Sequence, residues 1–322
     1  MRLLSFALLG LALAFSPCHE AVAEGWPDRP VTMIVPFPPG SAVDFLARAT
    51  ASHLAESYGK PFVVENRTGA GGNIGGAAVA KAPADGYTLL FGTPSPIAIN
   101  KLMYKGLSYD SAKDFMPVVL VARSPLMIST RLGFPAKTFE ELIAYAKKNP
   151  GKVNVGNPGN GTLGHITAEL IQQFTGVTMT MVPYRGTVPL MTDLLGGQVD
   201  VAMDFMPTYV PQVIERKINA LAVTTSQRSK QLPDVPTVQE AGFKGFEASA
   251  WYAMVAPTGT PPDIIGKLNK GVNDFLKSDM TKSLLEQNTL EGVGGSPEDL
   301  KAFIASELAK WKPVIEAAKI SM

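Results

Sequence analysis

Residues 36–41 have the composition of an anion-binding loop. They include Gly40 and Ser41, follow the apolar run 32–35, and precede a helical pattern that ends near residues 58–59. This order predicts a strand, a loop and the start of a helix. In an open α/β sheet such a loop lies at the carboxyl end of its strand, where ligands bind. The free N–H groups and the dipole of the following helix would favour an anion there.

Two other loops have the same context and contain hydroxyl side chains. Residues 92–95 follow the apolar run 87–91, and residues 156–162 follow the run 153–155. Thr93 and Ser95 act either as ligand contacts or as ordinary turn residues. Ser41 and Thr162 act either as ligand contacts or as plain helix caps.

Four ionisable residues near the expected loops are further candidates. Asp44 orients the first loop, binds a ligand amino group, or only complements the helix dipole. His165, just inside a helix, either donates to a ligand oxygen or packs in the interior. Arg185 either pairs with an anion or forms a structural or surface ion pair. Asp204, at the carboxyl end of an expected strand, is a cleft candidate of similar weight.

The elements that must position these residues alternate between short β-rich runs and helical patterns. Residues 237–240 form a capping box that predicts a short helix, and the chain beyond Pro261 is expected to be helical. We expect strands over residues 32–35, 62–65, 87–91, 118–128, 153–155, 179–183, 200–204, 219–224 and 248–256. We expect the main helices over residues 43–58, 96–104, 138–149, 163–175, 207–217, 263–277 and 280–287, and from 297 onward.

This alternation predicts an α/β fold. Strands that alternate with helices form parallel sheets built from right-handed βαβ units. The apolar run 118–128 is longer than a typical strand, so we interpret it and residues 248–256 as crossings between two domains. The first domain is expected to contain residues 24–123 and 248–322, and the second residues 124–247, with a ligand cleft between them.

Residues 1–23 have the pattern of a secretory signal peptide. Arg2 is followed by the apolar run 3–15 and by small residues at 21–23, which predicts cleavage after Ala23 and a periplasmic mature protein. Lipidation of Cys18 is the alternative, but residues 15–17 are a poor match to the sequence that precedes a lipidated cysteine. Cys18 is the one cysteine of the sequence, so cleavage leaves neither a disulfide nor a thiol nucleophile.

Composition argues against two classes of partner. With 46% apolar and 18% charged residues, the chain resembles an ordinary globular α/β protein. Its formal net charge of +1 gives no bulk attraction to nucleic acid or to an anionic membrane.

Enzyme signatures in the sequence are weak. Residues 159–164 match G-x-G-x-x-G, but no acidic residue stands about 20 positions on and Pro158 lies in the loop. Residues 92–96 lack the final glycine of a nucleophile elbow. Only His53 and His165 remain after cleavage, which is too few for a histidine-rich metal site or a well-supported triad.

We therefore expect a binding protein without catalytic residues, metal or cofactor. The alternative is an exported hydrolase or lyase that acts on a small organic acid through Ser95 or Asp204 together with His165.

A series of motifs extends from the start of the mature chain to the last helix. They are WPDRP at 26–30, IVPF at 34–37, ENRTGAGG at 65–72, DGYTLL at 85–90, VPYRG at 182–186, DLLGG at 193–197, LPDVPT at 232–237 and APTGTP at 256–261. In this order and spacing the chain resembles the substrate-binding receptors of tripartite tricarboxylate transporters, the Bug family. The resemblance implies a periplasmic type II binding-protein fold and a small carboxylate ligand in an interdomain cleft. It also implies a two-subunit membrane permease as partner, and we expect the receptor itself to be a monomer.

The family's binding mode, as the resemblance implies it, uses two facing strand-to-helix loops as a pincer on a carboxylate. Both loops precede helix N-termini, where charge-assisted N–H···O bonds are worth roughly 1.5–3 kcal/mol each. The first arm corresponds to Phe37, Gly40 and Ser41, and the second to Asn160, Gly161 and Thr162.

The first arm departs from the usual family pattern. Family members typically have two glycines followed by a polar pair and an aspartate in this loop. Pro39 and the pair Ala42 and Val43 make it stiffer and less polar here, while Gly40, Ser41 and Asp44 keep the pattern.

Overall fold

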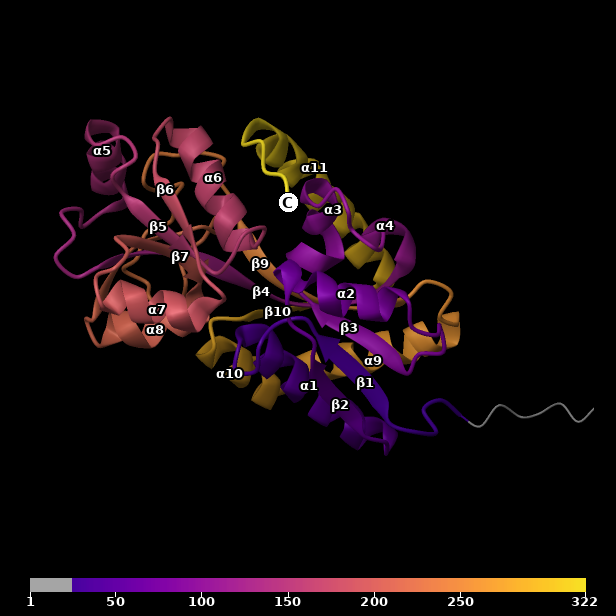
Figure 1. The fold of residues 1–322 in the computed structure, drawn as a ribbon. Coiled ribbons are helices and arrows are strands. Elements are labelled where there is room, and N and C mark those ends of the chain that lie inside the picture. The colour runs from indigo at the N-terminus through magenta and orange to yellow at the C-terminus, as the bar shows by residue number, and fades with distance from the viewer. Residues whose placement is uncertain (1–24) are drawn as a thin grey trace, which may run out of the picture.

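The computed structural model describes residues 25–322 (Figure 1). The expected signal peptide, its cleavage after Ala23 and Cys18 therefore lie outside the described residues. Within 25–322, no helix combines the length and the apolar character needed to cross a membrane.

The first sheet has the strand order β2 (Phe62–Asn66), β1 (Val31–Val35), β3 (Thr88–Gly92), β9 (Ser249–Pro257) and β4 (Phe115–Arg131). β10 (Glu291–Gly294) adds to the first half of β4. The helical segments that accompany this sheet are α1 (Ala42–Tyr58), η1 (Ala70–Gly72), α2 (Asn73–Ala80), η2 (Ser95–Ile99), α3 (Asn100–Met103), α4 (Ser111–Asp114), α9 (Pro262–Lys277), α10 (Asp279–Gln287) and α11 (Pro297–Ala317).

The second sheet is built on the other half of β4. That half pairs with β7 (Val201–Phe205) and β8 (Ile218–Val223), and β7 continues to β5 (Asn154–Asn157) and β6 (Thr180–Pro183). Its helices are α5 (Phe139–Lys148), α6 (Leu163–Thr175), α7 (Thr187–Leu195) and α8 (Met206–Ile214). Figure 1 shows this group and the first sheet with its helices as two lobes, with β4 and β9 passing between them.

The two expected crossings explain the long apolar runs. β4 has 17 residues because it serves both sheets, and every residue of β9 is buried. β4 and β9 pair with each other antiparallel from Phe115 to Pro125, with two register shifts. A strand that is covered on both faces needs apolar side chains along its whole length, and this produces a continuous run in place of alternation.

The expectation of purely parallel sheets is only partly correct. β1 pairs in parallel with β2 and β3, and β5 pairs in parallel with β6 and β7, as βαβ units require. The crossings β4 and β9 and the strand β10 pair antiparallel with their neighbours. β9 runs against the βαβ strands of the first sheet, and β4 runs against those of the second, because each enters that sheet from the other lobe.

Two local predictions are wrong. Thr237 and Glu240 make the reciprocal hydrogen bonds of a capping box, at 2.8 and 3.1 Å, but the chain forms only a turn there. Gly242, with φ of +95°, follows too soon for a helix to propagate. The region beyond Pro261 is not entirely helical, because Glu291–Gly294 adds to β4 as β10.

The ends of the helices that approach the candidate loops follow local chemistry. Ser41 caps α1 and Thr162 caps α6, and each helix ends at a glycine of positive φ, Gly59 and Gly176. The core is apolar and includes Trp251 and Trp311, both fully buried. Their indole N–H groups donate to the same Glu307 oxygen at 3.0 and 3.1 Å, so both tryptophans are structural.

Candidate functional site

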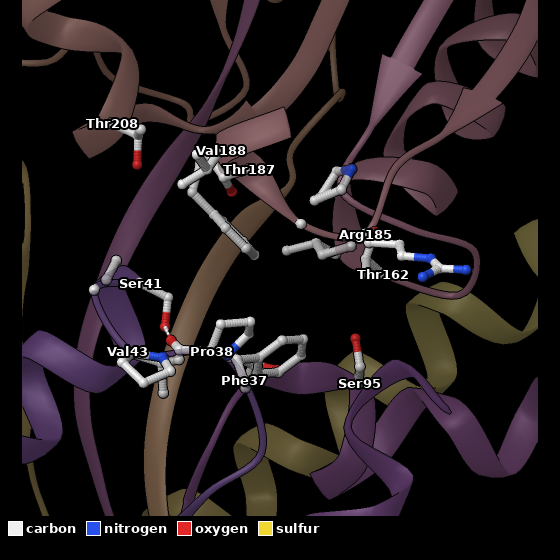
Figure 2. A pocket seen from close by; sticks show the side chains of 18 of the residues that line it. Phe37, Pro38, Ser41, Val43, Ser95, Thr162, Arg185, Thr187, Val188 and Thr208 are labelled. Atoms are coloured by element: carbon white, nitrogen blue, oxygen red, sulfur yellow. Dashed lines mark hydrogen bonds between the residues drawn. The ribbon is translucent and has the colours of Figure 1, made fainter. Parts of the chain in front are cut away.

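One pocket, with a cavity volume of about 260 Å³, is lined by segments of both sheets (Figure 2). It lies where β1, β3, β5, β6 and β7 end, which is the expected place for a ligand in an α/β fold. Its lining residues are Phe37, Pro38, Pro39, Gly40, Ser41, Ala42, Val43, Thr93, Pro94, Ser95, Pro158, Thr162, Leu163, Arg185, Gly186, Thr187, Val188, Pro189, Phe205, Thr208 and Tyr252.

Four helix N-termini meet at this pocket. The cap or first turn of α1, α6, α7 and α8 contributes to its wall. Within residues 25–322 no protein acceptor takes the N–H groups of Ala42, Val43, Leu163, Thr187 and Val188. No carboxylate lines the cavity. The pocket therefore combines free donors with positive helix ends, an environment that favours an anion.

The loop before α1 is held by the buried carboxylate of Asp44. This carboxylate accepts hydrogen bonds from Gly40 N at 3.0 Å, from Asn66 Nδ2 at 2.8 Å and from two Arg48 nitrogens at 3.0 Å. Burial alone would raise the pKa of Asp44, but the Arg48 guanidinium, Gly40 N–H and Asn66 amide lower it below its ordinary value. Asn66 Nδ2 also donates to Phe37 O at 2.9 Å. Asp44 thus braces the loop from behind and does not line the pocket.

The loop before α6 is held by neutral groups. Thr162 Oγ1 donates to Gly159 O at 2.6 Å, and Gly161 N–H donates to His165 Nδ1 at 3.2 Å. Burial lowers the pKa of His165, so its ring is neutral at physiological pH. Asn160 is exposed, and Gly161 O accepts from Ser95 Oγ of the other lobe at 3.3 Å. This loop contacts the opposite lobe through Gly161.

Asp204 is fully buried at the end of β7, directly before the pocket residue Phe205. Its carboxyl accepts from Phe205 N at 2.7 Å and from Tyr209 Oη at 3.3 Å. No Lys or Arg of the described residues forms an ion pair with it. Burial raises the pKa of Asp204 to about 7. A neutral, protonated form is therefore substantially populated near physiological pH.

The structure brings together some of the sequence-predicted residues and separates others. Arg185 is exposed at the pocket edge, and Figure 2 shows its guanidinium extending away from the labelled prolyl and phenyl side chains of the opposite wall. Of the predicted set, Phe37, Gly40, Ser41, Thr93, Ser95, Thr162 and Arg185 line the cavity, whereas Asp44, Asn160, Gly161, His165 and Asp204 do not.

Sequence reasoning missed the wall formed by α7, α8 and β9. Thr187 and Val188 open α7, Thr208 is in the first turn of α8, and Tyr252 lies on β9. A signal for α7 was present, because residues 180–188 repeat the order of strand, glycine-containing loop and helix seen at the other two arms. No local pattern marks Tyr252, which reaches the pocket only because β9 crosses between the sheets.

The described part of the chain has no group of three or more His, Cys, Asp and Glu side chains arranged to hold a metal ion. Ser95 and His165 are each hydrogen-bonded to the backbone of Gly161, and no hydrogen bond joins them within residues 25–322. The geometry of a nucleophile with its general base is therefore not formed by this pair.

Comparison with known proteins supplies the family. The model of the tripartite tricarboxylate transporter family receptors matches residues 46–320. The chain belongs to this family. Its curated relatives include protein BugT of Bordetella pertussis, which is 39% identical over 314 residues that cover 96% of this chain and 95% of BugT.

Solved structures of family members have the same fold. The R. palustris protein Rpa4515, solved with adipate, is 42% identical with a TM-score of 0.87, over 92% of this chain and 99% of that one. The periplasmic binding protein BugD is 36% identical with a TM-score of 0.84, over 92% and 99%. MatC of Rhodopseudomonas palustris, with bound malate, is 33% identical with a TM-score of 0.84, over 90% and 100%. The resemblance and the type II binding-protein fold class are thereby confirmed.

Proposed function

We propose that this receptor binds a small carboxylate in the pocket and delivers it to the membrane subunits of a tripartite transporter. The observation that supports this best is the meeting of four helix N-termini around a cavity without acidic lining. Relatives solved with adipate and malate belong to the same family. The carboxylate would accept from the free N–H groups of α1, α6 and α7, with Ser41 and Thr162 nearby.

The two lobes provide a way to enclose the ligand. We assign residues 24–123 with 248–322 to one domain and residues 124–247 to the other, because β4 leaves the first sheet and enters the second near residues 123–126. Closure by a small hinge rotation at β4 and β9 would bring the α1 loop towards the α6 and α7 loops. Export through residues 1–23 would place this monomeric receptor in the periplasm, beside its permease.

Catalysis is not part of this proposal. Relatives of the family are described as periplasmic binding proteins and receptors. Asp204 and His165 have structural roles in this scheme. Asp204 accepts a hydrogen bond from Phe205 N, His165 accepts one from Gly161 N, and neither residue lines the cavity.

Calorimetry on protein freed of co-purified ligand by unfolding and refolding tests this function. Adipate, malate, benzoate and 4-hydroxybenzoate would be titrated, each acid beside its neutral amide. We expect at least one acid to bind about tenfold more tightly than its amide, because charge-assisted hydrogen bonds are about twice as strong as neutral ones. Native mass spectrometry of the protein before stripping would identify the natural ligand. Equal affinity for acid and amide, or no binding by any acid, would overturn the proposal.

A further inference from the structure

The pocket lining includes apolar side chains as well as helix ends and hydroxyl groups. Phe37, Pro38 and Val43 lie around the cavity (Figure 2). Leu163 and Phe205 also line it. Such a wall gains free energy by covering hydrocarbon and offers nothing to the hydroxyl and carboxyl groups of a strongly polar acid.

Two hydroxyl groups in the lining lack partners. Thr93 is 3% exposed and Tyr252 is 1% exposed, and both line the cavity. Neither Thr93 Oγ1 nor Tyr252 Oη has a hydrogen-bond partner within the described chain. Buried hydroxyl groups are normally satisfied, so a pair of unsatisfied ones at a cavity indicates a group that the ligand supplies.

The register of the sheet places these two residues together. β3 and β9 pair antiparallel, with Leu90 opposite Val255 and Gly92 opposite Ala253. One further step puts Thr93 opposite Tyr252, and residues directly opposite each other project from the same face of a sheet. Continuing this register places Thr93 and Tyr252 on one side of the sheet, and both residues line the pocket.

The surroundings of this pair select against a second negative charge. Arg185 is the one cation among the lining residues, and it is exposed at the edge. Tyr252 is close enough to the buried Asp204 that this carboxyl adds to the effect of burial in raising the pKa of the tyrosine. A buried second carboxylate would meet two neutral hydroxyl groups and apolar walls, without a cation to compensate its desolvation.

We propose that Thr93 and Tyr252 form a second subsite that binds an uncharged oxygen, a hydroxyl or keto group, on the apolar body of a monocarboxylate. This inference rests on the proposed function, because the carboxylate at the helix ends fixes the orientation of the ligand. It assigns the receptor to apolar monocarboxylates that carry one neutral oxygen, in contrast to the dicarboxylates adipate and malate bound by two relatives.

Calorimetry of the stripped protein with 4-hydroxybenzoate, benzoate, terephthalate and adipate tests the subsite. We expect the wild type to bind 4-hydroxybenzoate about tenfold more tightly than benzoate, the effect of one added buried hydrogen bond. Terephthalate, with a second carboxylate at the same position, and adipate should bind more weakly than benzoate.

Tyr252→Phe and Thr93→Val are the decisive variants. Each should reduce the preference for 4-hydroxybenzoate over benzoate to threefold or less, measured within the same variant. Tyr145→Phe is the matched control, because Tyr145 lies on α5 outside the pocket and its loss should leave the preference intact.

The outcomes separate this inference from the proposed function. Binding of benzoate without preference for 4-hydroxybenzoate, a preference retained in both variants, or tightest binding of terephthalate or adipate overturns the subsite alone. Failure of every acid to bind overturns the proposed function and the subsite together. The wild-type comparison of the four probes decides the matter even if a variant does not fold.

Discussion

The two walls of the pocket each depend on a buried aspartate, but the two aspartates are stabilised in opposite ways. Asp44, behind the α1 loop, is ionised and accepts from Arg48, Gly40 and Asn66. Asp204, beside the α7 and α8 wall, accepts from neutral groups, namely Phe205 N–H and the hydroxyl groups of Tyr209 and Thr187. One wall is thus held by charge and the other by neutral hydrogen bonds. A site for an anion benefits, because the first carboxylate is compensated by a guanidinium and the second is substantially protonated near neutral pH.

The largest effect should follow from rebuilding either anion loop with proline. Ser41→Pro or Thr162→Pro removes a backbone donor and reshapes the loop, since Ser41 N donates to Pro38 O and Thr162 N to Gly159 O. Calorimetry with the tightest acid of the panel should show a loss of affinity of more than about 100-fold. Ser41→Ala and Thr162→Ala keep the N–H groups and serve as matched controls with smaller losses. Wild-type affinity in a folded proline variant would show that the pincer is misplaced.

The charged wall should depend strongly on Asp44. Asp44→Ala removes the acceptor for Gly40, Asn66 and Arg48, and we expect a loss of roughly 2 kcal/mol in the free energy of unfolding. The value is moderate because the side chain of Arg48 is 52% exposed and regains water. Urea denaturation at pH 7 measures it.

The stabilisation that Asp44 contributes should depend on pH. The pKa of Asp44 is lowered in the folded protein, so its contribution is present above the ordinary value of 3.8 and is lost as pH falls below it. The stability difference between wild type and Asp44→Ala should therefore shrink on acidification below pH 4. A difference that stays constant would contradict the ionised network.

Substitution of Asp204, in the wall held by neutral hydrogen bonds, should change the free energy of unfolding less than substitution of Asp44. Its dependence on pH should be opposite. The pKa of Asp204 is raised to about 7 from 3.8, so the folded state retains a proton that the unfolded state releases between these values. Wild-type stability should fall as pH rises through 7, whereas Asp204→Asn, which mimics the protonated acid, carries no such loss. The variant should gain about 1 kcal/mol relative to wild type between pH 6 and pH 7.

Urea denaturation of both proteins at a series of pH values measures this difference. Asp200→Asn is a useful contrast. Asp200 directly precedes β7 of the second sheet, but its carboxylate forms an ion pair with Arg131 at 3.0 Å. It should lose stability on neutralisation. If the stability difference between Asp204→Asn and wild type stays constant between pH 6 and pH 7, Asp204 is already ionised in the folded protein at pH 6 and the comparison of the two walls is wrong.

Helix caps and the alternation of strands and helices along the chain were predictable because they depend on near neighbours. Ser41 and Thr162 each stand just before a helical pattern, and both cap the helices expected from them. Asn160 and Gly161 share the second loop with Thr162, yet they contact the other lobe or solvent. Nothing within a few residues of Asn160 specifies which way the loop turns, because Tyr104 and Ser95, which pack on it, belong to distant elements.

The sequence by itself determined the family, the alternating α/β elements, the two crossings and the two loops before α1 and α6. It did so because periodicity, caps and motif spacing are local properties. Only the tertiary structure decided that β4 and β9 run antiparallel to their neighbours and that α7 and α8 complete the wall. It alone brought Tyr252 and Thr93 into the lining of one pocket and placed Asp204 where no Lys or Arg of residues 25–322 pairs with it. Those properties come from contacts between residues far apart in the chain, which set burial, pairing direction and pKa independently of the local pattern.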